Sequence, residues 1–457
     1  MRSPVRSLTR LSLVGAALAA AACSDQSPVA PRDNGPRLST TSAPAAPGYI
    51  VALRGQAKSD FKKSVESLGG KLERQLNGPG LVTVSGLNAA SATQLLRRSD
   101  IASVTQDVSI QWIPTTDRIV QMVAAPTTLG GATITGTDQS TAFFFDQFQW
   151  NLKVTKASSA WLTTPSGAGA EVCVLDTGTD PGHLDLDGKI DLAKSTSFVA
   201  SEPFIEDFNF HGTFVSALIS SNGFGMASVA PDAKLCAVKV LDFTGHGSFG
   251  DVISGIVYAA DQGVDAINMS LGAYVDLNQV GAKDLVRALQ AAVDYARSKG
   301  VVVVVSSGND GRDLDADAAN FLEVPAQLKG VISVGATAPT AQQNFDHLTE
   351  YSNFGGTTGI KLVAPGGDFV AAGQQEDLIF SACSEFVCGD IFHYALGAGT
   401  SFASPHVAGE AAVIESNFAG NQSNTTIEGC ILKGTDVVGA VRFFGRGRMN
   451  VLKAAGC

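Results

Sequence analysis

A run of five valines at 301–305, followed at once by Ser-Ser-Gly-Asn, constrains the fold of this chain more than any other feature. A short, fully apolar run of β-branched residues is typical of a strand that is buried on both faces. A second apolar run ends just as abruptly at Asp176, which is followed by Thr-Gly. Polar residues at the carboxyl ends of parallel strands lie where open α/β sheets place their chemistry. The sequence therefore predicts an α/β fold with Asp176 at the functional edge of the sheet.

Two further segments supply groups that such an edge can use. Ser401 lies in GTSFASPHVAG (399–409), a tight turn that leads into a helix, and His211 opens a second helix in HGTFVSALIS (211–220). A serine hydroxyl is a weak nucleophile until a base takes its proton, and that base is usually a histidine held by a carboxylate. Each residue taken singly fits a structural role such as a turn or a helix cap. Together, in the order Asp, His, Ser, they indicate nucleophilic catalysis.

These segments resemble the signature segments of the subtilisin-like serine proteases, the subtilases. The matching motifs are D-T-G at Asp176, H-G-T at His211 and G-T-S-x-A-x-P-H at Ser401, in a chain order known for this family. Asn309, after the valine run, falls where the family carries its side-chain oxyanion donor. The resemblance implies a subtilisin-like parallel sheet flanked by helices and a serine endopeptidase. It implies attack by Ser401, proton transfer by His211, orientation by Asp176 and oxyanion binding by Asn309.

The resemblance also implies a substrate-binding surface. Its backbone and pocket residues are expected to be Gly245, Gly247, Ser270, Leu271, Gly272 and Gly308. The segment before VPA (324–326) brings Glu323 close to the floor of the pocket for the residue that precedes the scissile bond. A buried carboxylate there would favour Lys or Arg, because it needs a cationic partner. The alternative is a solvated loop glutamate.

Residues 1–22 are typical of a secretory signal peptide, since arginines precede an apolar stretch that ends in small residues. LAAAAC (18–23) resembles a lipoprotein box with Cys23 as the lipid-bearing residue, and ordinary cleavage after Ala22 is the alternative. The Pro/Ser/Thr/Ala-rich residues 23–47 are typical of a flexible tether. We therefore expect an exported protein, extracellular or in the cell envelope, that contacts a membrane only through such a lipid.

Residues 48–112 predict a small βαββαβ sandwich of the ferredoxin-like type. Its strands and helices are expected at 49–53, 57–70, 81–87, 89–99 and 101–112. Immediately upstream of a subtilase domain, such a unit resembles the family's inhibitory prodomain; an unrelated small binding domain is the alternative. The Thr/Gly/Ala-rich residues 113–148 are predicted to be a linker that contains the processing site, and 149–457 the catalytic domain.

The expected partners are protein or peptide substrates and the chain's own prodomain, which would act as an intramolecular inhibitor. The enzyme is expected to be a monomer. The formal net charge of −11 argues against nucleic acid and anionic membranes. A catalytically silent subtilase-fold binding protein is the competing function, although all four catalytic residues are present. A serine-carboxyl peptidase would carry a glutamate in place of His211 and an aspartate in place of Asn309. An α/β-hydrolase would carry its serine in GxSxG.

An even number of further cysteines in an exported chain suggests disulfide bridges. They are Cys173, Cys236, Cys383, Cys388, Cys430 and Cys457. The spacing allows a small loop closed by Cys383 and Cys388 and a C-terminal clamp of Cys430 and Cys457. It leaves Cys173 and Cys236 either bridged or as two buried thiols.

The chemistry requires no cofactor, and no His/Cys cluster indicates a metal. Asp185 matches a position where many subtilases hold a structural calcium. The segment that would supply the other ligands, between His211 and Pro231, is short. The sequence leaves calcium open there, and the acidic residues 310–317 are either a second oxygen-ligand site or a solvated loop.

Overall fold

The computed structural model describes residues 48–457 except 115, 116, 118, 120, 132–136, 317, 369–374 and 419–421. The predicted signal peptide, Cys23 and the tether lie outside the described residues. In the described part of the chain, no helix combines the length and the apolar character needed to cross a bilayer.

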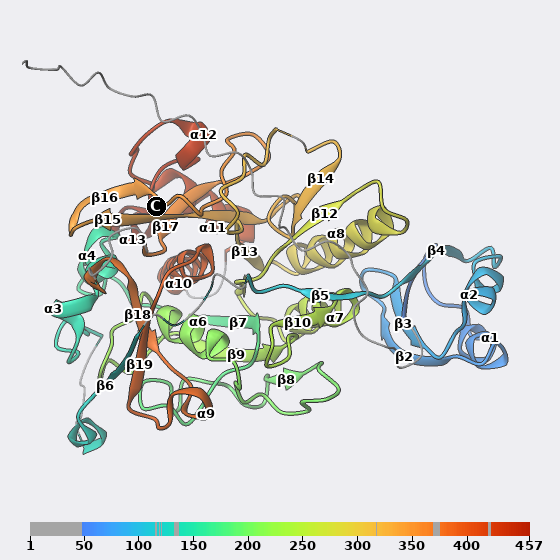
Figure 1. The fold of residues 1–457 in the computed structure, drawn as a ribbon, viewed down its shortest axis with the longest axis horizontal. Helices are drawn as coiled ribbons and strands as arrows, with labels where there is room; N and C mark the ends of the chain where they lie inside the picture. The colour runs from blue at the N-terminus through green and yellow to red at the C-terminus, as the bar shows by residue number, and fades with distance from the viewer. Residues whose placement is uncertain are drawn as a thin grey trace, which may run out of the picture.

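The N-terminal unit is the predicted βαββαβ sandwich. Its strands form a four-stranded sheet in the order β2-β3-β1-β4, and its two helices pack on that sheet. The elements are β1 (Tyr49–Leu53), α1 (Phe61–Ser67), β2 (Lys71–Leu76), β3 (Leu81–Ser85), α2 (Ala89–Leu95) and β4 (Ile101–Gln106). This sheet lies at one end of the molecule, beside α7 (Phe249–Asp261) and α8 (Ala282–Ser298) (Figure 1).

The rest of the chain is built on an eight-stranded, mostly parallel sheet, which confirms the α/β prediction. Its order is β16-β15-β13-β11-β7-β9-β8, with β17 also paired to β15, and only β15 and β16 run antiparallel. The strands are β7 (Glu171–Asp176), β8 (Thr196–Ser197), β9 (Lys234–Lys239), β11 (Ala266–Met269), β13 (Val302–Ser306), β15 (Ile332–Thr340), β16 (Gln343–Leu348) and β17 (Leu362–Pro365).

The valine run explains why helices cover both faces of this sheet. Val302 and Val304 pack in the core shared with α6 (His211–Ile219) and α10 (Thr400–Asn417). Val303 and Val305 pack in a second core with α7 and α8. Successive side chains of a strand point to opposite faces, so an uninterrupted apolar run requires cover on both.

Shorter elements complete the two units. The remaining helices are η1 (Thr127–Gly131), α3 (Phe145–Phe148), α4 (Trp150–Val154), α5 (Ala157–Ala160), η2 (Gln375–Asp377), α9 (Glu385–Cys388), α11 (Asn424–Lys433), α12 (Val441–Phe444) and α13 (Val451–Ala455). The remaining strands are β5 (Ser109–Gln111) with β10 (His246–Ser248), β12 (Ala273–Asp276) with β14 (Phe321–Val324), and β6 (Gln121–Ala124) with β19 (His393–Gly397) and β18 (Ile379–Ala382).

The expected last strand of the N-terminal unit, 101–112, is in fact two strands in two sheets. The half-buried Asp107 carboxylate accepts a hydrogen bond from the Gly250 N–H in the first turn of α7, at 2.9 Å. This contact turns the chain out of the small sheet after β4, and β5 then pairs with β10 of the large unit. The single-strand prediction was wrong because a tertiary capping contact interrupts the alternating pattern.

The segment 113–148 has more structure than its composition predicted. β6 pairs antiparallel with β19, and three of its phenylalanines, Phe144, Phe145 and Phe148, are buried in the core of the large unit. Burial of these aromatic side chains stabilises the C-terminal half of the segment against the catalytic core.

Candidate active site

Three elements bring the predicted catalytic residues together. Asp176 is the last residue of β7, His211 the first residue of α6, and Ser401 lies in the first turn of α10, and all three are almost fully buried. The His211 ring Nδ1 lies 2.8 Å from Asp176 Oδ1. This contact fixes the ring so that Nε2 faces the other side, the orientation that a general base needs.

A carboxylate that sequence reasoning missed holds the histidine helix in place. The buried Asp207 accepts hydrogen bonds from the Thr213 backbone N–H at 2.8 Å and from the Thr177 hydroxyl at 2.9 Å. It therefore caps the free N–H groups at the start of α6 and ties that helix to the end of β7. A Cβ at Gly212 would lie 1.9 Å from the Gly178 carbonyl oxygen, so only glycine allows this approach.

Asn309 is fixed as an amide donor by the start of α10. Its side-chain oxygen accepts hydrogen bonds from the Thr400 backbone N–H at 2.9 Å and the Thr400 hydroxyl at 2.7 Å. Its Nδ2 group is thereby aimed toward Ser401, beside the N-terminus of α10. An amide and a helix N-terminus in this position can stabilise a developing oxyanion.

Asp117, which no sequence motif indicated, lies between Ser401, His211 and Asn309. Its Oδ2 accepts a hydrogen bond from the Ser401 hydroxyl at 2.5 Å and lies 3.5 Å from His211 Nε2. Its Oδ1 accepts a hydrogen bond from Asn309 Nδ2 at 2.6 Å. Among the described residues, His211 Nε2 has no hydrogen-bond partner, so the serine hydroxyl donates to Asp117 and not to the histidine.

The carboxylates on both sides of His211 change its protonation. Burial lowers the pKa of His211, but Asp176 and Asp117 together raise it to about 10. The imidazole is therefore protonated near neutral pH in this state, and a protonated ring cannot accept the serine proton. The site thus holds the parts of a serine nucleophile, with the serine hydroxyl directed to Asp117.

The predicted substrate edge carries a segment of the same chain. Gly247 pairs with Ile110 in the β5–β10 ladder, and the Trp112 N–H donates to the Gly245 carbonyl at 3.0 Å. On the opposite side, the Gly272 N–H donates to the Trp112 carbonyl at 3.0 Å. An extended chain is thus bound between two backbone segments, as a peptide added to a sheet edge would be.

Ser270 connects that edge to the catalytic serine. The Ser270 hydroxyl donates to the Ser401 carbonyl at 2.6 Å, and the Ser401 hydroxyl lies 3.3 Å from the Ser270 carbonyl oxygen. Leu271 is fully buried in the core with α7 and α8.

Glu323 lies on β14 and is only 3% exposed, so the alternative of a solvated loop glutamate is wrong. Its Oε1 is 2.6 Å from the position that a Cβ at Gly272 would take and 3.0 Å from the corresponding position at Gly308. Burial, with Asp310 nearby, raises the pKa of Glu323 well above its usual range, and Arg312 lowers it only in part.

At Asp185, where the sequence left calcium open, the carboxylate is hydrogen-bonded within the protein. Both carboxylate oxygens of Asp185 are taken by donors of the protein, the backbone N–H groups of Phe224, Gly225 and Met226 and the Tyr394 hydroxyl, at 2.7–3.1 Å. Within the described ranges, no group of three or more His, Cys, Asp or Glu side chains is placed to hold a metal ion. The Asp185 carboxylate thus organises the 222–226 loop by itself.

The six cysteines pair in three disulfides: Cys173–Cys236, Cys383–Cys388 and Cys430–Cys457. The first, which the sequence left open, joins residues opposite each other on the parallel strands β7 and β9, with Cα atoms 4.5 Å apart. This bridge anchors the strand that ends in Asp176.

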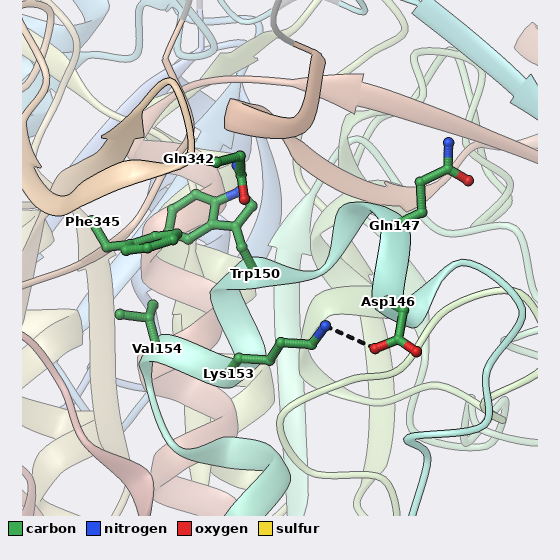
Figure 2. A pocket seen from close by; sticks show the side chains of 7 residues that line it. All are labelled: Asp146, Gln147, Trp150, Lys153, Val154, Gln342 and Phe345. Atoms are coloured by element: carbon green, nitrogen blue, oxygen red, sulfur yellow. Dashed lines mark hydrogen bonds and ion pairs between the residues drawn. The ribbon is translucent and has the colours of Figure 1, made fainter.

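A separate hollow of about 300 Å³ lies between α3, α4 and the start of β16. Figure 2 shows the side chains that line it. The rings of Trp150 and Phe345 lie side by side there, and the Lys153 ammonium group points toward Asp146, at 2.9 Å. No predicted catalytic or substrate-binding residue lines it.

Comparison with known proteins agrees with this arrangement. The profile of the subtilase family matches residues 167–447. A thermophilic serine proteinase from Bacillus sp. (strain AK1) is 35% identical over 68% of this chain and 68% of its own length. Thermitase from Thermoactinomyces vulgaris is 33% identical over 68% of this chain and 97% of its own.

A crystal structure of the epidermin leader peptide processing serine protease (EpiP) from Staphylococcus aureus has the same fold. It matches with a TM-score of 0.72 and 23% identity over 90% of this chain and 97% of that one. The family match spans more than half of the chain, and the relatives exceed 30% identity over two thirds of it. On these grounds the chain belongs to the subtilase family and is a serine endopeptidase.

Proposed function

We propose that this endopeptidase is exported and made as a latent precursor, with Ser401 as its nucleophile. Ser401 Oγ attacks the carbonyl carbon of the scissile peptide bond while His211 Nε2 takes the hydroxyl proton. Asp176 stabilises the resulting imidazolium through the Nδ1 contact. The carbonyl oxygen becomes an oxyanion that accepts hydrogen bonds from Asn309 Nδ2 and the Ser401 backbone N–H.

The second half of the reaction uses the same groups. The imidazolium gives its proton to the leaving amine nitrogen as the peptide C–N bond breaks, which leaves an acyl-enzyme on Ser401. Water then attacks the ester with His211 as base, and the serine is released. This cycle requires a neutral His211, and in the precursor arrangement its pKa is about 10.

One observation carries the proposal of latency: the Asp117 carboxylate bridges Ser401 Oγ and Asn309 Nδ2. A carboxylate has the shape and charge of the oxyanion that these donors bind, so it occupies the place of a reacting carbonyl. Residues 48–112 thereby act as an inhibitory prodomain, because β5 delivers the chain to the substrate edge immediately upstream of Asp117.

The pairing of β6 with β19 supports a processing cut before Gln121. A cut between β5 and β6 leaves β6 paired with β19 in the catalytic core, whereas β5 stays with the prodomain and separates from β10 when the prodomain is released. This narrows the expected site from 113–148 to the residues between Gln111 and Gln121.

The test is the N-terminal sequence and intact mass of the purified protein beside a Ser401→Ala control. We expect the wild type to yield a shortened chain that hydrolyses casein, and the control to persist as the full precursor without activity. Normal processing and casein hydrolysis by the control would refute the proposed nucleophile.

Export and lipidation of Cys23 belong to the same proposal. If Cys23 carries the lipid and the prodomain is removed, the anchor leaves with the discarded piece and the mature enzyme is released. Membrane fractionation should find the Ser401→Ala precursor in the pellet and the wild-type catalytic domain in the supernatant. Wild-type catalytic domain in the pellet would contradict this release, and a soluble precursor would favour ordinary cleavage after Ala22.

A further inference from the structure

The side chain of Glu323 points between two backbone segments that frame the catalytic serine. β14 pairs antiparallel with β12, with Glu323 opposite Tyr274 and Val324 opposite Ala273. β12 follows directly after Gly272, whose N–H binds the chain segment on the substrate edge.

Both walls around the Glu323 carboxylate are made of glycine. Oε1 lies 2.6 Å from a Cβ position at Gly272 and 3.0 Å from one at Gly308, so any side chain at either position would collide with it. Gly308 directly precedes Asn309, and Gly272 is two residues from Ser270, which contacts Ser401. The carboxylate therefore lies at the base of the gap beside the reacting groups.

One oxygen of the Glu323 carboxyl group lacks a hydrogen-bond partner. Among the described residues, no donor hydrogen-bonds to Glu323 Oε2, although the atom is fully buried. Arg312 offsets the effect of burial on the pKa of Glu323 only in part. Its guanidinium group lies 4.2 Å above the Tyr274 ring and its Nε 3.8 Å from Asp310. A buried carboxylate without a hydrogen-bonded partner is costly, and a cation that enters the gap removes this cost.

We propose that Glu323 makes this endopeptidase select a cationic side chain, arginine or lysine, immediately before the scissile bond. The inference rests on the proposed function, since it assigns the substrate class of that same site. An apolar side chain in the gap would exclude water from the carboxylate without pairing it, so the site rejects such substrates as well as favouring basic ones.

The chain's own sequence offers a first substrate of this class. Between Gln111 and Gln121 it contains a single basic residue, Arg118, directly after Asp117. Cleavage after Arg118 would give a mature enzyme that begins at Ile119, within the window that the β5 and β6 pairings leave for the cut.

The first experiment measures kcat/KM of the mature enzyme on peptides that differ only in the residue before the cleaved bond. We expect arginine and lysine to exceed phenylalanine by at least about 100-fold, and the isosteric Glu323→Gln variant to lower the arginine-to-phenylalanine ratio at least tenfold. Glu410→Gln, which alters another buried glutamate, is the matched control and should keep the wild-type ratio. Equal wild-type rates for arginine and phenylalanine, or an unchanged ratio in Glu323→Gln, would overturn the assignment.

A serine-reactive phosphonate probe separates this inference from the proposed function. Labelling of the wild type but not of Ser401→Ala, with no preference for basic peptides, would overturn only the role of Glu323. Absence of labelling and of hydrolysis would overturn the proposed function itself. If Glu323→Gln fails to fold, the wild-type peptide panel and the first N-terminus formed by processing still test the proposal. An N-terminus at Ile119 supports it, and an N-terminus that follows an uncharged residue contradicts it.

Discussion

Replacing Asp117 by asparagine keeps the shape of the group that bridges Ser401 and Asn309 but removes its charge. In this structure, Asp176 and Asp117 raise the pKa of His211 from 6.5 to about 10, against the effect of burial. At pH 7.5 only about one molecule in 300 then carries the neutral ring that self-processing requires. Asp117 supplies part of this shift through a contact of 3.5 Å to Nε2, and the closer Asp176 supplies the larger part.

If the substitution lowers the pKa of His211 by about 1.5 units, it removes about 2 kcal/mol of stabilisation from the imidazolium. The neutral fraction at pH 7.5 then rises to about one in ten, which is an increase of about 30-fold. We expect the precursor of Asp117→Asn to process itself about 30-fold faster than the wild type at this pH. The difference should shrink above pH 10, where the ring is neutral in both proteins.

Two measurements check this reasoning. The first follows the precursor by intact mass after a jump to each pH. The second titrates histidine labelled with ¹⁵N by NMR in the Ser401→Ala background, where no processing occurs. Asp138→Asn is the matched control, because Asp138 is exposed in the same 113–148 segment. An unchanged pKa of His211 in Asp117→Asn, or processing within twofold of the wild type at pH 7.5, would refute the role of this carboxylate.

Three further predictions concern the mature enzyme and its stability. Asn309→Ala should lower kcat by about 10²–10³-fold with little change in KM, since its amide acts on the oxyanion; a pure KM effect in steady-state kinetics would contradict this. Burial raises the pKa of Glu410 from 4.5 to about 8, so its contribution to stability is full below pH 4.5 and is lost as the pH rises to 8. Urea titrations between pH 4.5 and 9 should therefore show that Glu410→Gln in the Ser401→Ala background loses about 5 kcal/mol less of its free energy of unfolding than Ser401→Ala alone. Parallel pH profiles of the two proteins would contradict this contribution of Glu410. Replacing Cys430 and Cys457 by serine opens a loop with a sequence separation of 27 and should lower the free energy of unfolding by about 3.5 kcal/mol; an unchanged urea midpoint would show that the bridge does not stabilise the fold.

The parts of the site that sequence motifs predicted are those fixed by local structure. Asp176 ends a buried strand, and His211 and Ser401 begin helices, so the residues next to each in sequence determine its place. The apolar valine run likewise fixes the layer order, because both of its faces need cover. Such features are encoded within ten residues and can be predicted from one chain.

Asp117 and Glu323 depend instead on pairings between distant segments. Asp117 reaches Ser401, 284 positions away, only because β5 docks on β10 and Asp107 caps α7. Glu323 is buried only because β14 pairs with β12. Asp117 lies in no local pattern that differs from an ordinary loop, so its role follows from the tertiary structure alone. The resemblance placed Glu323 near the pocket, but only the tertiary structure decides between a buried carboxylate and a solvated loop residue.

The contacts between the N-terminal unit and the large unit show how the proposed cleavage would weaken the binding of the N-terminal unit. Arg74 pairs with Asp251 at 2.8 Å, and Asp107 caps the same helix. While the chain is intact, these contacts and β5 act at the high effective concentration of a tethered segment. A cut between β5 and β6 turns the same contacts into a bimolecular interaction that dilution weakens. If the proposed cut follows Asp117, release of the N-terminal piece would also remove one of the two carboxylates that raise the pKa of His211. Under the proposed processing, release of the N-terminal unit would thus free the substrate edge and lower the pKa of His211 in a single step.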